Sequence, residues 1–166
     1  MQPEEVRKCL LNYRDYSARV AYLEAEIGRL RMIKESYERT IVEDNVSVTQ
    51  KLSASPHGSG VGDPVGILAQ RLADGFKPEY IAEIQQEIAD KENEHMVKKM
   101  LVSYVDSWLI ALNPRERFVI EKQYIGGMFW RETVYEFKER FGEFYTKQGL
   151  QKLRARALNK IYEIAE

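Results

Sequence analysis

The chain has 166 residues, of which 44% are apolar and 31% charged, and its formal net charge is −1. This apolar content is enough for a folded core and excludes a wholly disordered chain. No apolar run approaches the ~18 residues that a membrane span needs. The single cysteine, Cys9, excludes an intrachain disulfide and a zinc site built on cysteines. With one cysteine and no membrane span, we expect a reduced, cytoplasmic protein. Because no segment alternates as a strand would, we expect an all-α fold.

Residues 1–44 are predicted to form one long coiled-coil helix. Apart from Pro3 and Gly28 this segment has no helix-breaking residue, and its apolar side chains recur every 3.5 residues. The helix would be ~60 Å long and would pair in a coiled coil or a long hairpin, unless it folds back on its own domain. Lys34 is a polar residue in this seam, of the kind that fixes register or oligomer number. The predicted oligomerisation residues are Val6, Tyr13, Val20, Leu23, Ile27, Leu30, Tyr37 and Ile41.

Residues 45–63 are predicted to be a flexible linker because they are rich in Ser and Gly. Their glycine-rich stretch lacks the Lys-Ser/Thr ending of a phosphate-binding loop. Residues 64–112 are expected to form connecting helices. A short helix over 65–73 would begin at Asp63 and Pro64, and a longer one would cover 79–112.

Residues 113–166 are predicted to form a domain of three helices. Asn113, Pro114 and Glu116 make a strong helix start, with Asn113 as the cap. Glycines at 126 and 127 would end this helix, and Gly142 would end a second helix that begins near Trp130. The last helix is expected over 146–165. Its predicted inward stripe is Leu150, Leu153, Ala157, Ile161 and Ile164.

The last helix also concentrates positive charge. Residues 113–166 carry a net charge of +3, and residues 145–162 contain five basic side chains and no acidic one. Amides can pair with adenine edges and cations with guanine or phosphate, so the face opposite the stripe predicts contact with double-stranded DNA. The alternative is a basic helix that complements its own dipole and stays solvated. Arg154 projects near the core boundary, as a snorkelling or ion-paired residue would. The predicted DNA-binding residues are Lys147, Gln148, Gln151, Lys152, Arg156, Asn159 and Lys160.

The stretch from Leu112 to Ile120, the stretch from Tyr124 to Glu132 and the run Leu153-Arg-Ala-Arg-Ala-Leu158 together resemble the helix-turn-helix of region four of bacterial sigma factors. More specifically, the chain resembles the sigma-like phage regulators of the RinA and ArpU type. These combine an N-terminal helical coil, a linker similar to residues 55–66 and a C-terminal sigma-like domain. The chain departs from the pattern at Phe129, where a Ser or Thr cap is usual, and at Thr133, where an Ile would be buried.

The resemblance implies a phage or prophage activator of late, packaging or lysis genes. It also leaves the host RNA polymerase open as a partner, beside a second copy of the chain bound through the N-terminal coil. One alternative is a DNA-packaging subunit similar to phage small terminases, which a ring of eight or more subunits would favour. Another is a coiled-coil adaptor that acts on polymerase through exposed aromatic residues without binding DNA.

An enzyme is not expected from this sequence. Its carboxylate pairs lie on charged helix faces without a partner His or Cys, and its two histidines, His57 and His95, lack ligand spacing. We accordingly expect no catalytic residue, no metal site and no cofactor.

Overall fold

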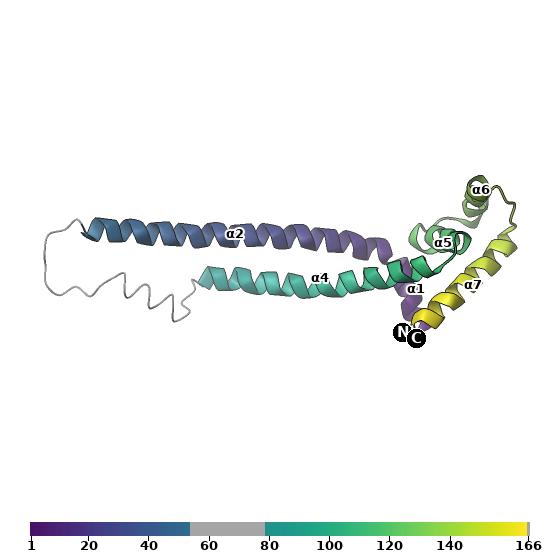
Figure 1. Cartoon of the computed structure of the whole chain (residues 1–166), viewed down its shortest axis with the longest axis horizontal. Helices are drawn as coiled ribbons and strands as arrows, with labels where there is room; N and C mark the ends of the chain where they lie inside the picture. The colour runs from purple at the N-terminus through teal and green to yellow at the C-terminus, as the bar shows by residue number, and fades with distance from the viewer. Residues whose placement is uncertain (54–78, 166) are drawn as a thin grey trace. The chain divides into compact units, whose positions relative to one another are not determined.

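The computed structural model describes residues 1–53 and 79–165, the segment 40–53 by its backbone alone (Figure 1). Every regular element in these residues is a helix, as expected for the all-α class. None of the helices described is both long and apolar enough to cross a membrane. The chain divides into two compact units, Met1–Tyr22 with His95–Glu166, and Leu23–Glu94. The predicted helix over 65–73 and residues 54–63 of the predicted linker lie outside the residues described.

The N-terminal segment forms two helices, which corrects the single helix that the sequence predicts. Helix α1 covers Pro3–Leu11 and α2 covers Tyr13–Ser53. Helix α1 ends at Asn12, whose backbone takes φ −96° and ψ 7°, and whose side-chain Nδ2 competes for the Lys8 carbonyl oxygen by donating to it at 2.8 Å. Helix α2 continues beyond the predicted linker start at residue 45, since residues 45–53 contain neither Gly nor Pro to stop it.

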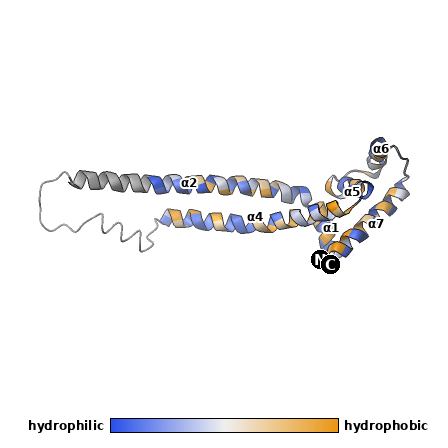
Figure 2. Cartoon of the chain, viewed as in Figure 1, coloured by the Kyte–Doolittle hydropathy of each residue, from blue (hydrophilic) through white to orange (hydrophobic). Residues whose placement is uncertain are grey.

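The first unit contains two apolar clusters. In one cluster α1 supplies Val6, Cys9 and Leu10, which pack with residues from the end of α4 (Glu79–Ala111) and from the C-terminal half of α7 (Lys147–Ala165). The other cluster joins α5 (Pro114–Ile120), α6 (Trp130–Phe141) and the N-terminal half of α7. Helix α7 therefore crosses both clusters, and Figure 2 shows it banded between apolar and polar residues.

The buried side of α7 follows the predicted stripe except at its end. Leu150, Ala157 and Ile161 are fully buried, but Ile164 is 51% exposed, so its predicted place in the core is wrong. The reason is α1, which packs on the neighbouring flank of α7. On that flank Leu158 is buried and the hydroxyl of Tyr162 accepts a hydrogen bond of 2.8 Å from Arg7 Nε. In the last turns of α7, the buried side is therefore the flank with Leu158 and Tyr162, and Ile164 lies outside it.

The second unit is a helical hairpin. Ile27 and Leu30 of α2 pack against Ile84 and Ile88 of α4. Arg31 pairs with Glu92 at 2.5 Å, and the ring of Tyr37 lies 5.0 Å from that of Tyr80, so the two helices run antiparallel. The part of the predicted seam that lies in this unit is therefore used within the chain, in the hairpin form, whereas Val6 and Cys9 pack in the first unit. The bounds of α4 agree with the predicted helix over 79–112 to within one residue.

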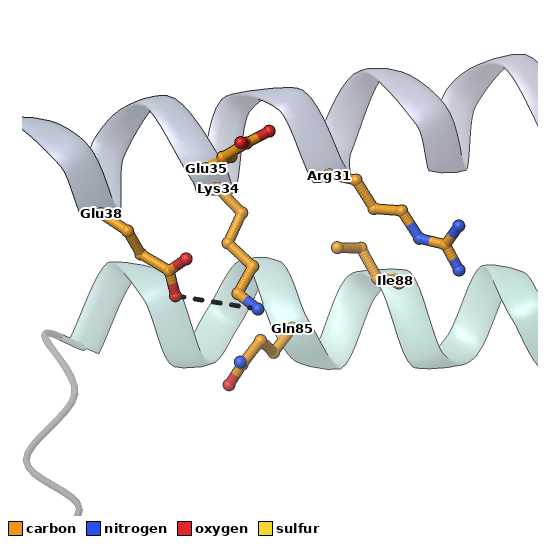
Figure 3. Close-up of a pocket in the computed structure, with 6 residues that line it drawn as sticks. All are labelled: Arg31, Lys34, Glu35, Glu38, Gln85 and Ile88. Carbon is orange, nitrogen blue, oxygen red and sulfur yellow. Dashed lines mark ion pairs between the residues drawn. The ribbon is translucent and has the colours of Figure 1, made fainter.

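A polar layer interrupts the apolar contact of this hairpin. Lys34 extends from α2 toward α4, with its Nζ 3.7 Å from Glu38 Oε1 (Figure 3). Arg31, Gln85 and Ile88 line the same pocket of about 210 Å³. The ion pair of Lys34 is with Glu38 on its own helix, so the role in fixing register that the sequence suggests for Lys34 stays a prediction.

Candidate nucleic-acid interface

The candidate interface belongs to a domain that begins with a well-capped α5. Asn113 Oδ1 accepts hydrogen bonds from the backbone N–H groups of Arg115 and Glu116, at 3.1 and 2.9 Å. Glu116 Oε2 accepts in return from the backbone N–H of Asn113 at 3.2 Å. This reciprocal box confirms the predicted helix start and satisfies N–H groups that a helix leaves unpaired. It also holds the carboxylate of Glu116 in the interior, where it is 1% exposed.

A π-helical turn, Glu121–Ile125, follows α5 and leads into the turn at Gly126 and Gly127. Gly127 has φ 60°, a conformation that favours glycine. Gln123 Nε2 donates to the carbonyl oxygen of Met128 at 3.0 Å and to Thr133 Oγ1 at 2.7 Å. The Thr133 hydroxyl donates in turn to the carbonyl oxygen of Phe129 at 3.1 Å. The burial of Thr133 is tolerated because its hydroxyl both accepts and donates a hydrogen bond.

Helix α6 starts without a side-chain cap at Phe129, whose backbone N–H donates to Glu132 Oε2 at 3.2 Å. Its inner face is aromatic. The ring of Phe137 lies 5.6 Å from that of Phe118 and 4.7 Å from that of Phe141. Gly142 then takes the left-handed conformation, with φ 66°, and its N–H donates to the carbonyl oxygen of Lys138 at 2.8 Å. This is the predicted glycine end of the helix.

Two residues shape the start of α7. Thr146 Oγ1 accepts a hydrogen bond of 3.2 Å from the backbone N–H of Gly149. A Cβ at Gly149 would lie 3.2 Å from Cδ1 of Tyr145, closer than ordinary contact. Tyr145 itself packs 5.0 Å from the ring of Phe137. The glycine in the first turn of α7 thus lets the Tyr145 ring reach the aromatic cluster.

The predicted DNA-binding residues share one side of α7. Five are exposed: Lys147, Gln148, Lys152, Arg156 and Asn159. Gln151 is half-buried at the edge of this face, and Ala155 adds an exposed position without a long side chain. We call the seven residues Lys147, Gln148, Gln151, Lys152, Ala155, Arg156 and Asn159 the α7 face. It has no acidic residue, and Glu163 is exposed one turn beyond its C-terminal end.

Lys160 differs from the other predicted DNA-binding residues because its ammonium group is already paired. Its Nζ donates to Glu116 Oε2 at 2.8 Å, and its side chain is 43% exposed. A phosphate contact by Lys160 stays a prediction, while the structure assigns it a contact that joins α7 to the capping box of α5.

Arg154 lies at the core boundary, where the sequence predicts it. Its guanidinium carbon is 5.0 Å from the centre of the Trp130 ring, and its Nε is buried without a hydrogen-bond partner. A cation over an indole face is attracted by the ring quadrupole. This contact ties the middle of α7 to the first residue of α6, and the sequence offers no spacing signal that pairs the two residues.

The predicted oligomerisation residues also find partners within the chain. Val6, Leu23, Ile27 and Leu30 are buried. The hydroxyl of Tyr13 donates to Asp106 Oδ1 at 2.7 Å, and Tyr37 contacts Tyr80. Val20 is half-buried, and the side chain of Ile41 lies outside the residues described. Self-association through this seam stays a prediction.

Comparison of the chain with protein-family models, with curated proteins and with solved structures gives no match.

Proposed function

We propose that the chain is a sequence-specific DNA-binding transcription regulator and that α7 is the helix that enters the major groove. In this proposal α5, α6 and α7 act as a sigma-like helix-turn-helix, with α7 as its recognition helix. One observation carries the proposal: the exposed, acid-free α7 face lies opposite a stripe that is buried in two apolar clusters.

The chemistry of the α7 face suits a duplex. Gln148 and Asn159 present amides, which can bind an adenine edge through two hydrogen bonds, and Arg156 can bind guanine in the same way. Residues 148–159 occupy ~16 Å of helix, about three turns, so the face begins at the N-terminal end of α7, the part of a recognition helix that contacts base edges. The exposed methyl of Ala155 leaves room for close approach to a groove wall.

Rigid support of α7 also favours the proposal. Base readout requires side chains that are held in place before binding, because a loosely held site loses both affinity and specificity. Lys160 with Glu116 fixes α7 on α5, and Arg154 with Trp130 fixes it on α6. The contact of Arg7 with Tyr162 adds α1 at the other end of the helix.

The biological setting rests on the resemblance to RinA- and ArpU-type regulators. We propose activation of late, packaging or lysis genes of a phage or prophage, in the cytoplasm of the bacterial host. Host RNA polymerase and a second copy of the chain are the proposed protein partners.

The experiment that tests DNA binding removes two cations from the α7 face. Lys152→Ala with Arg156→Ala should weaken binding to duplex DNA, and the slope of log K against log salt should fall by about 0.9 for each phosphate that is no longer neutralised. The matched control is Lys8→Ala with Arg14→Ala, which removes the same charge from exposed positions on α1 and α2. Equal binding by both double variants, measured by fluorescence anisotropy at several salt concentrations, would contradict the proposal.

Specificity is tested by selecting bound sequences from random duplexes with the full chain. A reproducible motif is expected, because amide and guanidinium groups on a rigid helix discriminate between base edges. Enrichment without any shared motif would leave only phosphate binding and would refute sequence-specific regulation.

A further inference from the structure

We propose that Phe144 is a specificity-determining residue of the DNA interface and that its ring contacts the 5-methyl group of a thymine. The inference rests on the proposed function and goes further, since it names one base that the bound site must contain. The aromatic side chain of Phe144 is 74% exposed, although the neighbouring residues of its loop are anchored.

Phe144 lies in the loop between α6 and α7, and contacts of the flanking residues hold this loop in place. On one side of Phe144, the carboxylate of Glu143 pairs with the guanidinium of Arg115 on α5. On the other side, Tyr145 packs 5.0 Å from Phe137 inside the aromatic cluster. Because both neighbours are held by the domain, the ring of Phe144 between them is directed to solvent.

The position of Phe144 in the chain places it beside the α7 face. It precedes Lys147 by three residues and Gln148 by four, and Thr146 caps the helix that follows. The N-terminal residues of a recognition helix are those that reach base edges in the major groove. An exposed apolar ring at this place meets the one apolar group that the groove offers, the thymine methyl.

A second exposed phenylalanine provides the matched comparison. Phe129 is 78% exposed and is the N-cap residue of α6, whereas Phe144 lies three residues before the first residue of α7. It lies at the start of the helix that would cross the DNA backbone, where no base edge is presented. The two residues therefore have the same chemistry and similar exposure but different expected contacts.

The test replaces thymine by uracil, one position at a time, in a duplex selected by the full chain. Uracil keeps every hydrogen-bonding group of thymine and lacks only the methyl. At one position the substitution should weaken binding by the wild-type chain about four-fold, the effect of one buried methyl group. Phe144→Ala should bind more weakly and should not distinguish the two bases there, whereas Phe129→Ala should distinguish them as the wild type does.

The outcomes separate the two proposals. If the wild-type chain selects a motif but no thymine-to-uracil change weakens binding, the role of Phe144 is wrong and DNA recognition by α7 stands. The same holds if Phe144→Ala keeps the full discrimination. If the wild-type chain selects no motif, the proposed function fails and this inference fails with it. The uracil series on the wild-type chain can refute the role of Phe144 without any variant, so a folding defect in Phe144→Ala cannot prevent that outcome.

Discussion

Lys160 Nζ donates a hydrogen bond of 2.8 Å to Glu116 Oε2 and thereby connects the third helix of the C-terminal domain to the first turn of α5. The same carboxylate oxygen accepts the backbone N–H of Asn113, so one buried group serves both a helix cap and a contact between helices. Removal of the lysine would leave a carboxylate that is 1% exposed with a single remaining donor.

Lys160→Met, which keeps the aliphatic stem, should lower the free energy of unfolding by about 1–3 kcal/mol, the cost of leaving a buried acceptor unsatisfied. Lys152→Met is the matched control on the exposed side of the same helix and should change stability by less than about 0.5 kcal/mol. Urea unfolding followed by circular dichroism measures both. Equal stability of the two variants would show that the pair contributes nothing.

The same variant tests the predicted phosphate contact of Lys160. If its ammonium group serves Glu116 alone, Lys160→Met should leave the salt slope of DNA binding unchanged, once the comparison is made where the variant is fully folded. A salt slope for Lys160→Met that is lower by about 0.9 would show that Lys160 does contact a phosphate.

Helix α1 is predicted to be a structural part of the DNA-binding unit rather than a free coil. Leu10 is fully buried while the adjacent Leu11 is 58% exposed. Leu10→Ala should therefore cost about 2–5 kcal/mol of unfolding free energy. Leu11→Ala should cost less than about 0.5 kcal/mol in the same urea titration. Similar destabilisation by the two variants would mean that α1 does not dock as described.

Cys9 reports the same docking through its chemistry. It is the only cysteine in the sequence and is 6% exposed; burial raises the pKa of its thiol above the ordinary 9.0, and the charge of Glu5 adds to this. A smaller thiolate fraction and a covered sulfur both slow reaction with a disulfide reagent. The native chain should react slowly, Leu10→Ala faster and Leu11→Ala at the native rate.

The helices of the C-terminal domain were predictable because their ends carry local signals. Asn113 and Gly142 act through contacts within a few residues, so the sequence alone locates them. Asn12 gives a weaker signal than Gly142, since asparagine can end a helix but also occurs within helices. The side chain of Asn12 competes for the Lys8 carbonyl oxygen, and the burial of Val6 and Leu10 against α4 and α7 accompanies the break as a tertiary effect.

The exposed side of α7 could be predicted from the sequence, but the contacts that hold α7 on α5 and α6 could not. The period of 3.6 residues separates Leu150 from Lys152 without any knowledge of the fold. The partners of Lys160 and Arg154 are 44 and 24 residues distant in sequence, and only the packing of α7 on α5 and α6 brings them together. The exposure of Phe144 likewise could not be predicted, because it depends on the contacts of Glu143 with Arg115 and of Tyr145 with Phe137.

The hydrogen bond from Tyr13 to Asp106 gives a prediction for alkaline pH. This bond is the main reason that the pKa of Tyr13 is raised above its ordinary value of 10.0, and burial adds to it. A group whose folded pKa is raised stabilises the fold below its unfolded pKa, and this contribution disappears as pH rises through the folded value.

Tyr13→Phe should therefore lower the free energy of unfolding by about 1 kcal/mol at pH 7, the usual worth of one hydrogen bond. The difference from wild type should shrink as pH rises above about 10. Tyr22→Phe, at a tyrosine that is 52% exposed, is the control. A difference that is constant from pH 7 to pH 11 would contradict the role of this hydrogen bond.

Two helical glycines should respond oppositely to alanine. A Cβ at Gly28, inside α2, would meet nothing within 4 Å, so Gly28→Ala should gain the helix propensity of about 1 kcal/mol. At Gly149 the same gain is opposed, because the new Cβ would lie 3.2 Å from the ring of Tyr145. That ring is held against Phe137 and can yield only by disturbing the aromatic cluster. Gly149→Ala should therefore give no net stabilisation in urea unfolding. A full gain of about 1 kcal/mol at Gly149 would show that Tyr145 moves freely and does not hold the loop that orients Phe144.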